Sequence, residues 1–175
     1  MMMRMLEAGG IPVWTDGIRF ADDQNPHGYY ELERVKDLDK TTDKRWLRAG
    51  RGRAVKVISS LLEHLPLTNN YAVLFMDRDL TEIVTSQNKM LADRGVANEA
   101  SNDVAMAAAF ETHLRYVNGW LARTAAFSTL HVPYRDTLAQ PTATAQRIRA
   151  FLRRDLAIES MVASVDASLY RNKAT

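Results

Sequence analysis

The middle of the chain carries a continuous apolar run that is followed by a helical pattern. Residues 71–76 are apolar and rich in strand-favouring side chains, and the run is too short for a globular helix. Such a run is typical of a strand buried on both faces of a parallel sheet. Beyond it, Asp79 and Glu82 have the spacing of a capping box, and apolar residues then recur at helical spacing. The pattern therefore predicts a strand that ends near Asp77 and a helix that Asp79 caps.

Apolar patterning elsewhere predicts strands and helices in alternation. Two further strands are expected, at residues 54–58 and 127–133. Helices are expected at residues 1–8, 30–38, 61–66, 103–126, from 141 and from 158. Alternating strands and helices are typical of the α/β class with a mostly parallel sheet. A chain of 175 residues with 46% hydrophobic and 25% charged residues fits a single domain over residues 1–175.

Two side chains near the first strand-to-helix junction have the chemistry to hold a phosphate. Arg78 lies just before the helix cap, and Ser86 lies seven residues beyond Asp79, on the same face of the predicted helix. A guanidinium carries a planar fork of donors, and the carboxyl ends of parallel strands are where ligands of such sheets bind. The sequence therefore predicts a phosphate clamp made by Arg78 and Ser86.

Three stretches, taken in order, resemble the sulfotransferases that use 3′-phosphoadenosine 5′-phosphosulfate (PAPS). Arg78 and Ser86 are similar to the family's motif for the 3′-phosphate of this donor. Residues 5–31 resemble the segment that follows the family's phosphosulfate-binding loop in bacterial members and ends in N-P-x-G-Y-[YF]-E. Residues 130–141, with Phe151 and Leu152, resemble the family's late strand and its Y-[ED]-D-L turn. The resemblance implies a P-loop-NTPase-like parallel sheet flanked by helices.

The activity implied by this resemblance is the transfer of a sulfuryl group, without a metal, to a hydroxyl or amine of a small-molecule or carbohydrate acceptor. The family's 5′-phosphosulfate loop lies before its first helix, and this chain begins inside what resembles that helix. We therefore expect a fold that is truncated at its N-terminus and lacks the N–H groups that would cradle the transferring group. The chain is then either part of a longer protein or a genuine remnant. Open strand edges would favour a homo-oligomer.

The resemblance assigns roles to four further residues, and each role has an alternative. Glu31 is the expected base for the acceptor's proton, or else it lies on the solvated side of the helix predicted at residues 30–38. Lys56 is expected to stabilise the leaving phosphate, or else it is an edge residue with its amine in solvent. Tyr134 is expected to pack near the adenine, or else to cover the core at a strand end. Arg171 is expected to approach a phosphate, or else to lie on a frayed, solvated end.

Composition bears on metal binding, on the cellular compartment and on membrane insertion. The chain has no Cys, and its four His show no metal-ligand spacing, so we expect no metal site. The absence of Cys fits a reducing compartment, and cytoplasm is the default. The longest apolar run, residues 104–110, is far shorter than the ~18 residues that a membrane helix needs.

Two other functions compete with the enzyme. The first is a non-catalytic relative that acts as a nucleotide-binding or protein-interaction domain. The second is a nucleic-acid binder that uses the basic runs at residues 40–56 and 147–154. It is the least favoured, because each run fits a solvated surface and no interleaved aromatic platform accompanies them.

Overall fold

The computed structural model describes residues 1–21, 25–26, 28–84 and 101–166, with the side chains of residues 101–103 left out. The chain divides into two compact units. Unit 1 comprises Met1–Asn70 and Gln140–Val165, and unit 2 comprises Tyr71–Ala139 and Asp166–Thr175. The expectation of one domain over residues 1–175 stays a prediction.

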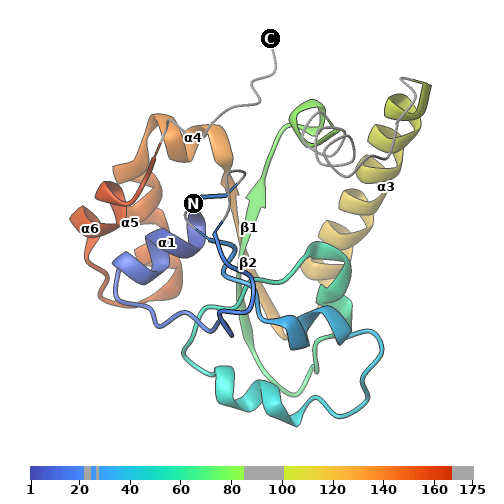
Figure 1. Ribbon diagram of the computed structural model, residues 1–175, viewed down its shortest axis with the longest axis horizontal. Coiled ribbons are helices and arrows are strands. Elements are labelled where there is room, and N and C mark those ends of the chain that lie inside the picture. Colours follow the sequence, from blue (N-terminus) through green and yellow to red (C-terminus); the bar gives the residue numbers. More distant parts are fainter. Residues whose placement is uncertain (22–24, 27, 85–100, 167–175) are drawn as a thin grey trace. The chain divides into compact units, whose positions relative to one another are not determined.

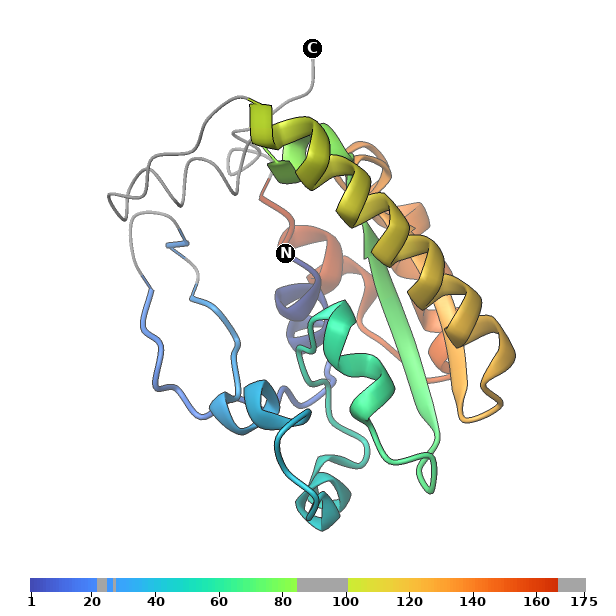
Figure 2. The ribbon, with the colours of Figure 1, turned by 90° about the vertical axis from the view of Figure 1, so that its right-hand side faces the viewer.

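Unit 2 is built on two parallel strands. Strand β1 (Tyr71–Asp77) pairs with β2 (Phe127–Pro133) so that their first residues face each other and Asp77 faces Pro133. Parallel strands need a crossover, which the helix α3 (Ser101–Arg123) supplies beside the strands (Figures 1 and 2). The ring of Trp120 in α3 lies 4.9 Å from that of Phe127. The structure confirms two of the three predicted strands, those at residues 71–76 and 127–133, and the mixed helix-and-strand class, and within the described residues the sheet has two strands.

The predicted helix start after β1 is also confirmed. The backbone N–H of Thr81 donates to Asp79 Oδ1 at 2.9 Å, as expected of a capping carboxylate, and residues 80–84 are helical. The rest of this predicted helix lies outside the described residues. Helix α4 (Tyr134–Ala139) follows β2 without a loop, and the buried Thr137 hydroxyl donates to the carbonyl of Pro133 at 2.9 Å.

Unit 1 is centred on three short helices, α1 (Met2–Ala8), α5 (Pro141–Leu152) and α6 (Ile158–Ala163). They gather around fully buried side chains of Met5, Ile148 and Met161 (Figure 1). The backbone N–H of Ala157 donates to the carbonyl of Gly9 at 3.2 Å, which joins the two ends of the chain. The helices predicted near residues 1, 141 and 158 are therefore confirmed.

The strand expected at residues 54–58 is wrong. Ala54 forms an isolated parallel bridge with Val13, and the segment after it is extended but unpaired in the sheet. The Ala54 N–H donates to the Pro12 carbonyl at 2.8 Å, and the Trp14 N–H donates to the Ala54 carbonyl at 2.9 Å.

The backbone explains why this ladder stops at one bridge. On one side Pro12 has no N–H to donate. On the other side a continued ladder would require the Asp16 N–H to donate to the carbonyl of Lys56. The Asp16 N–H instead donates to the carbonyl of Glu31 at 3.3 Å.

The helix expected at residues 30–38 is also wrong, because only the 3₁₀-helix η1 (Glu33–Asp37) forms there. Tyr30 has a φ of 52°, a left-handed conformation, and Leu32 is extended with φ -123° and ψ 107°, so helical structure begins only at Glu33. Two more 3₁₀-helices follow, η2 (Arg45–Gly50) and η3 (Ser59–His64). Helix η3 overlaps the short helix predicted at residues 61–66 but begins and ends two residues earlier, and α3 ends three residues before the predicted 126.

The contact between Gly9 and α6 gives a test of the unit 1 core. A Cβ at Gly9 would lie 2.8 Å from Met161 Cγ, and Met161 is fully buried. Gly9→Ala should therefore lower the free energy of unfolding by about 1–3 kcal/mol through overpacking, as measured by urea denaturation. Gly119→Ala is the control, because its Cβ would meet only the mobile end of Arg123. That variant should gain about 0.5–1 kcal/mol from helix propensity. Equal effects of the two variants would contradict the packing described here.

Candidate functional site

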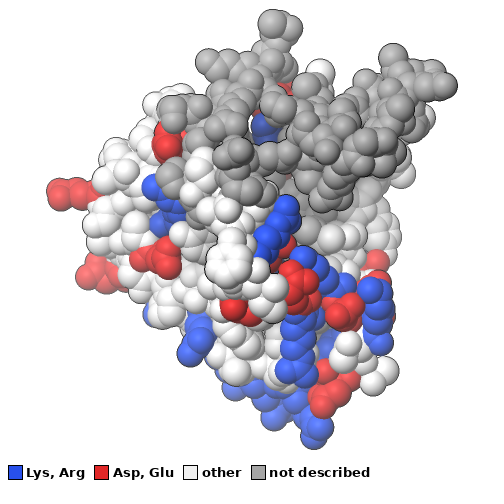
Figure 3. Space-filling model, in the orientation of Figure 1, with Lys and Arg blue, Asp and Glu red and all other residues white. Residues whose placement is uncertain are grey.

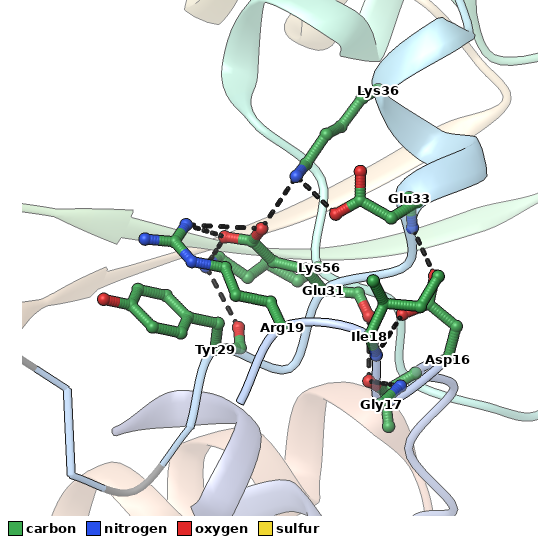
Figure 4. Close-up of polar contacts among 10 residues, drawn as sticks. Asp16, Gly17, Ile18, Arg19, Tyr29, Glu31, Glu33, Lys36 and Lys56 are labelled. Atoms are coloured by element: carbon green, nitrogen blue, oxygen red, sulfur yellow. Dashed lines mark hydrogen bonds and ion pairs between the residues drawn. The ribbon is translucent and has the colours of Figure 1, made fainter. Parts of the chain in front are cut away.

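The Glu31 cluster of unit 1 consists of Arg19, Tyr29, Glu31, Lys36 and Lys56. Three cations converge on the Glu31 carboxylate: Arg19 Nη1 lies 3.2 Å from Oε1, Lys56 Nζ 3.2 Å from Oε1, and Lys36 Nζ 3.0 Å from Oε2 (Figure 4). The Glu31 side chain is 16% exposed. A carboxylate accepts hydrogen bonds through both oxygens, so one residue orders three long side chains from separate segments.

An aromatic ring lies next to this ion cluster. The Arg19 guanidinium carbon lies 3.3 Å from the centroid of the Tyr29 ring, within the range of a cation–π contact. Lys56 Nζ donates to the Tyr29 carbonyl at 3.1 Å. Arg19 and Lys56 are therefore fixed both by the carboxylate and by Tyr29.

The backbone around Glu31 is held in an unusual shape. Tyr30 takes the left-handed conformation described above, and its hydroxyl donates to Glu7 Oε2 at 2.7 Å. Burial and this hydrogen bond raise the pKa of Tyr30 to about 12. The Thr15 hydroxyl donates to the Glu31 carbonyl at 2.8 Å, so main chain and side chain of Glu31 are both anchored.

These contacts change the acid–base character of Glu31. Burial raises its pKa, but hydrogen bonds from Lys36 and Lys56 and their charges outweigh burial, so the pKa of Glu31 falls below its ordinary value. A general base works best when its pKa lies near the working pH, and this shift goes in the opposite direction. In this arrangement Glu31 is suited to holding cations, and the alternative of a solvated helix face is wrong because Glu31 precedes η1.

The Glu82 cluster of unit 2 consists of Arg78, Asp79, Glu82, Tyr134 and Arg135. The Glu82 side chain is 0% exposed and meets Arg78 Nε at 3.3 Å and Arg135 Nη2 at 2.7 Å. Arg135 Nη2 also lies 3.9 Å from Asp79 Oδ2. Arg78 and Arg135 stay 30% and 51% exposed, so the buried carboxylate presents two guanidinium groups toward solvent.

The pairing of β1 with β2 brings two residues of the Glu82 cluster to the same edge of the sheet. Because Asp77 faces Pro133 in the register, the next residues, Arg78 and Tyr134, leave the sheet at the same carboxyl edge. The Arg78 guanidinium carbon lies 5.1 Å from the Tyr134 ring centroid. Burial raises the pKa of Tyr134, which Arg78 partly offsets, so the phenol stays protonated at neutral pH. Arg78 meets Glu82 through Nε, and that contact does not engage its two terminal nitrogens.

The predicted residues thus fall into two pairs. Glu31 and Lys56 meet in unit 1, and Arg78 and Tyr134 meet in unit 2. Ser86 and Arg171 lie outside the described residues.

Sequence reasoning missed Arg19, Lys36, Glu82 and Arg135. The spacing of four between Arg78 and Glu82 is a signal that could have indicated their pairing. The partners of Arg135 and Arg19 have no such signal, because the first pair is separated by 53 residues and the second bridges an irregular loop.

One histidine pairs with a carboxylate in a way that spacing could not indicate. His131 Nδ1 lies 3.0 Å from Asp77 Oδ2, across the two strands. Within the part of the chain that the structure describes, no three potential ligands gather in a way that could hold a metal ion. Among the same residues, no helix has the length and apolar character needed to cross a membrane.

The Glu82 cluster predicts a large effect for one charge removal. Glu82→Gln keeps the volume but removes the buried carboxylate that Arg78 and Arg135 share, so the free energy of unfolding should fall by about 1–3 kcal/mol at neutral pH. Glu111→Gln is the matched control, because Glu111 also pairs with an arginine four residues away, at 3.4 Å, but on an exposed helix face. It should change stability by less than about 0.5 kcal/mol. Denaturant curves for both variants make the comparison, and a small effect at Glu82 would contradict its structural role.

The lowered pKa of Glu31 predicts a pH-dependent contribution to stability. A carboxyl whose folded pKa is depressed stabilises the fold above its unfolded pKa, and the contribution is lost as the pH falls through the folded pKa. The difference in unfolding free energy between the natural chain and Glu31→Gln should therefore be full near neutrality, begin to fall as the pH drops below about 4.3, the pKa of an unperturbed glutamate, and vanish only below the depressed pKa of folded Glu31. Urea titrations at several pH values measure this difference. A difference that grows on acidification would be the opposite sign and would contradict the ion cluster.

Comparisons of this chain with protein-family models, with curated proteins and with solved structures find no match. The residues and contacts above, together with the motif resemblance, are therefore what supports a function.

Proposed function

We propose that the chain is a sulfotransferase-like protein that binds the nucleotide of 3′-phosphoadenosine 5′-phosphosulfate at the Glu82 cluster. The single observation that carries this proposal is the position of Arg78 over the Tyr134 ring at the carboxyl edge of two parallel strands. A guanidinium beside an aromatic ring suits a phosphate attached to an adenosine, because one group pairs with the charge and the other packs on the base. Sheets of this kind bind ligands at that edge.

The surrounding residues fit this ligand. Glu82 is fully buried and fixes Arg78 through Nε, which leaves the terminal fork of Arg78 oriented by a rigid partner. Arg135 is held by the same carboxylate and adds a second guanidinium beside the first. A P-loop-NTPase-like fold, with Ser86 next to Arg78 and Arg171 approaching the phosphate, completes the proposal. PAPS would supply the activated sulfuryl group.

In the catalytic form of this proposal, the acceptor oxygen or nitrogen attacks sulfur while the bond from sulfur to the bridging phosphate oxygen breaks. Negative charge then develops on the leaving phosphate, and the Lys56 ammonium is the group proposed to stabilise it. The acceptor's proton must pass to a base. Glu31 is the proposed base, and it can accept a proton only after exchanging its contacts with Lys36 and Lys56, which are 3.0 Å and 3.2 Å long.

A second candidate function is nucleotide binding without catalysis. The observation in its favour is the state of Glu31, whose pKa is lowered by the cations around it, so that it is a weaker base than an unperturbed glutamate. In this version the Glu82 cluster still binds the nucleotide, and the Glu31 cluster serves only to hold its loop.

The nucleotide site can be tested without knowing the acceptor. Calorimetric titration with 3′-phosphoadenosine 5′-phosphate should show binding to the natural chain. Arg78→Ala should weaken it by at least about tenfold, because charge-assisted hydrogen bonds contribute about 1.5–3 kcal/mol. Tyr134→Leu should weaken it by a similar factor if the base stacks on the ring, since base–aromatic stacking contributes about 1–3 kcal/mol.

The matched control is Arg115→Ala, since Arg115 is an exposed arginine of the same unit that pairs with Glu111. It should leave affinity unchanged. A folded natural chain that does not bind the nucleotide would refute both candidate functions. Binding together with an absence of sulfuryl transfer to any of a panel of phenols, sugars and amines would favour the non-catalytic candidate.

A further inference from the structure

The two basic runs of the sequence meet in unit 1. Arg154, directly after α5, donates from Nη1 to the carbonyl of Gly52 at 3.0 Å, although the two residues are 102 positions apart. Gly52 lies between Arg51 and Arg53. The contact therefore brings together the end of the first run and the end of the second, which sequence alone would treat as two separate solvated surfaces. We call Arg51, Arg53, Arg153 and Arg154 the arginine surface.

Local backbone geometry fixes the two halves of this surface. After η2, the chain turns at Gly52, which has a φ of +76°, and the Arg53 N–H donates to the Gly50 carbonyl at 3.0 Å. Helix α5 ends at Leu152, and the next residue, Arg153, has φ 51° and ψ 41°. Gly52 and Arg153 are thus both left-handed, and the hydrogen bond from Arg154 to the Gly52 carbonyl joins the two turns.

The four arginines are exposed, and within the described residues no salt bridge involves any of them. Their recorded polar partners are neutral: Arg51 donates to Asn69 Oδ1 at 3.1 Å, and Arg154 donates to a carbonyl. Asp155 is the acidic residue next to them in sequence. Two other basic residues of unit 1 are paired with carboxylates, Arg45 with Asp43 at 2.9 Å and Lys40 with Asp37 at 3.0 Å. Figure 3 shows that blue and red side chains lie next to each other in several places on one face of the molecule.

Arg153 has a left-handed backbone conformation at the end of α5. Left-handed backbone at the end of a helix is usually supplied by glycine, which has no Cβ to clash. An arginine there carries a cost of about 1 kcal/mol that a glycine would avoid. A cation at the C-terminus of a helix is also favoured by the helix dipole, so the case for the surface rests on the grouping and exposure of its four arginines.

We propose that the arginine surface binds the phosphate backbone of double-stranded nucleic acid. Guanidinium forks match phosphate oxygens, and uncompensated cations on a duplex gain affinity by releasing its condensed counterions. The surface offers charge alone, because the nearby Trp46 already contacts Arg34 at 4.7 Å and Trp14 at 5.6 Å. Single strands bind mainly by stacking on free aromatic rings, and acidic polysaccharides have lower charge density than a duplex, so the duplex fits best. The proposal is independent of the nucleotide site in unit 2.

The test measures binding of a fluorescent mixed-sequence DNA duplex of about 20 base pairs, two helical turns, by anisotropy. At about 50 mM salt the natural chain should bind, and affinity should fall steeply toward 200 mM salt because each neutralised phosphate adds about −0.9 to the slope of log K against log salt. The double variant Arg53→Gln/Arg153→Gly should flatten this slope by about 2, one for each arginine removed.

Three controls separate the proposal from its rivals. Arg153→Gly should also raise the melting temperature, since it relieves left-handed strain, so its loss of binding could not be caused by unfolding. Arg45→Gln, which removes an arginine already paired with Asp43, should change the slope by less than half as much. Excess 3′-phosphoadenosine 5′-phosphate should not displace the duplex.

Several outcomes would overturn the proposal. These are no binding at low salt, an equal loss in Arg45→Gln, displacement by the nucleotide, or a single strand of the same length that binds as tightly as the duplex. A heparin fragment that binds more than about tenfold tighter than the duplex, lost in the same double variant, would instead assign the surface to an acidic polysaccharide.

Discussion

Parallel pairing between β1 and β2 is the constraint on which unit 2 depends. Antiparallel strands would put Arg78 and Tyr134 at opposite edges, whereas parallel strands in this register release both residues at one edge. Parallel pairing in turn requires a long crossover, which explains why a helix of 23 residues lies between two strands of seven. The candidate nucleotide site therefore depends first on strand direction, which brings Arg78 and Tyr134 to the same edge.

Both clusters follow the same electrostatic principle, in which one poorly solvated carboxylate orders several cations. Removing a carboxylate from water is costly unless its oxygens are fully paired, so Glu82 and Glu31 each recruit more than one partner. The consequence is a set of arginine and lysine side chains held in place before any ligand arrives, and pre-ordered donors bind anions at a smaller entropic cost. The arginine surface differs, since Arg51 and Arg154 donate to neutral partners and no salt bridge among the described residues involves its four arginines.

Much of the fold could be predicted from local patterns, and the errors have physical causes. Apolar runs at residues 71–76 and 127–133 identify strands because burial on both faces requires them. Residues 54–58 are also apolar apart from Lys56, yet Pro12 on the paired segment and a competing carbonyl of Glu31 stop the ladder. A one-dimensional pattern shows neither which segment pairs nor which carbonyl competes. The helix predicted at residues 30–38 cannot begin at Tyr30, because Tyr30 adopts a left-handed conformation that its residue type gives no reason to expect.

For the sites, the sequence identified Glu31, Lys56, Arg78 and Tyr134 but not the partners that decide their charge, because those come from distant segments. The assignments of Glu31 as a base and of Arg78 as a phosphate ligand stay predictions. The contacts show that each residue already has an oppositely charged partner. Arg78 shares the buried Glu82 carboxylate with Arg135. Any anion would therefore bind to two guanidinium groups whose positive charge one carboxylate already partly offsets.

The left-handed backbone at Tyr30 has a consequence for how the Glu31 loop moves. Local unfolding of this segment would relieve the strain at Tyr30. The free energy of that local unfolding is therefore smaller than the sum of the contact energies that it would break. The hydroxyl of Tyr30 on Glu7 and the cations on Glu31 keep the segment closed against this bias. An anion that drew Arg19 or Lys56 away from Glu31 would remove contacts that oppose this bias.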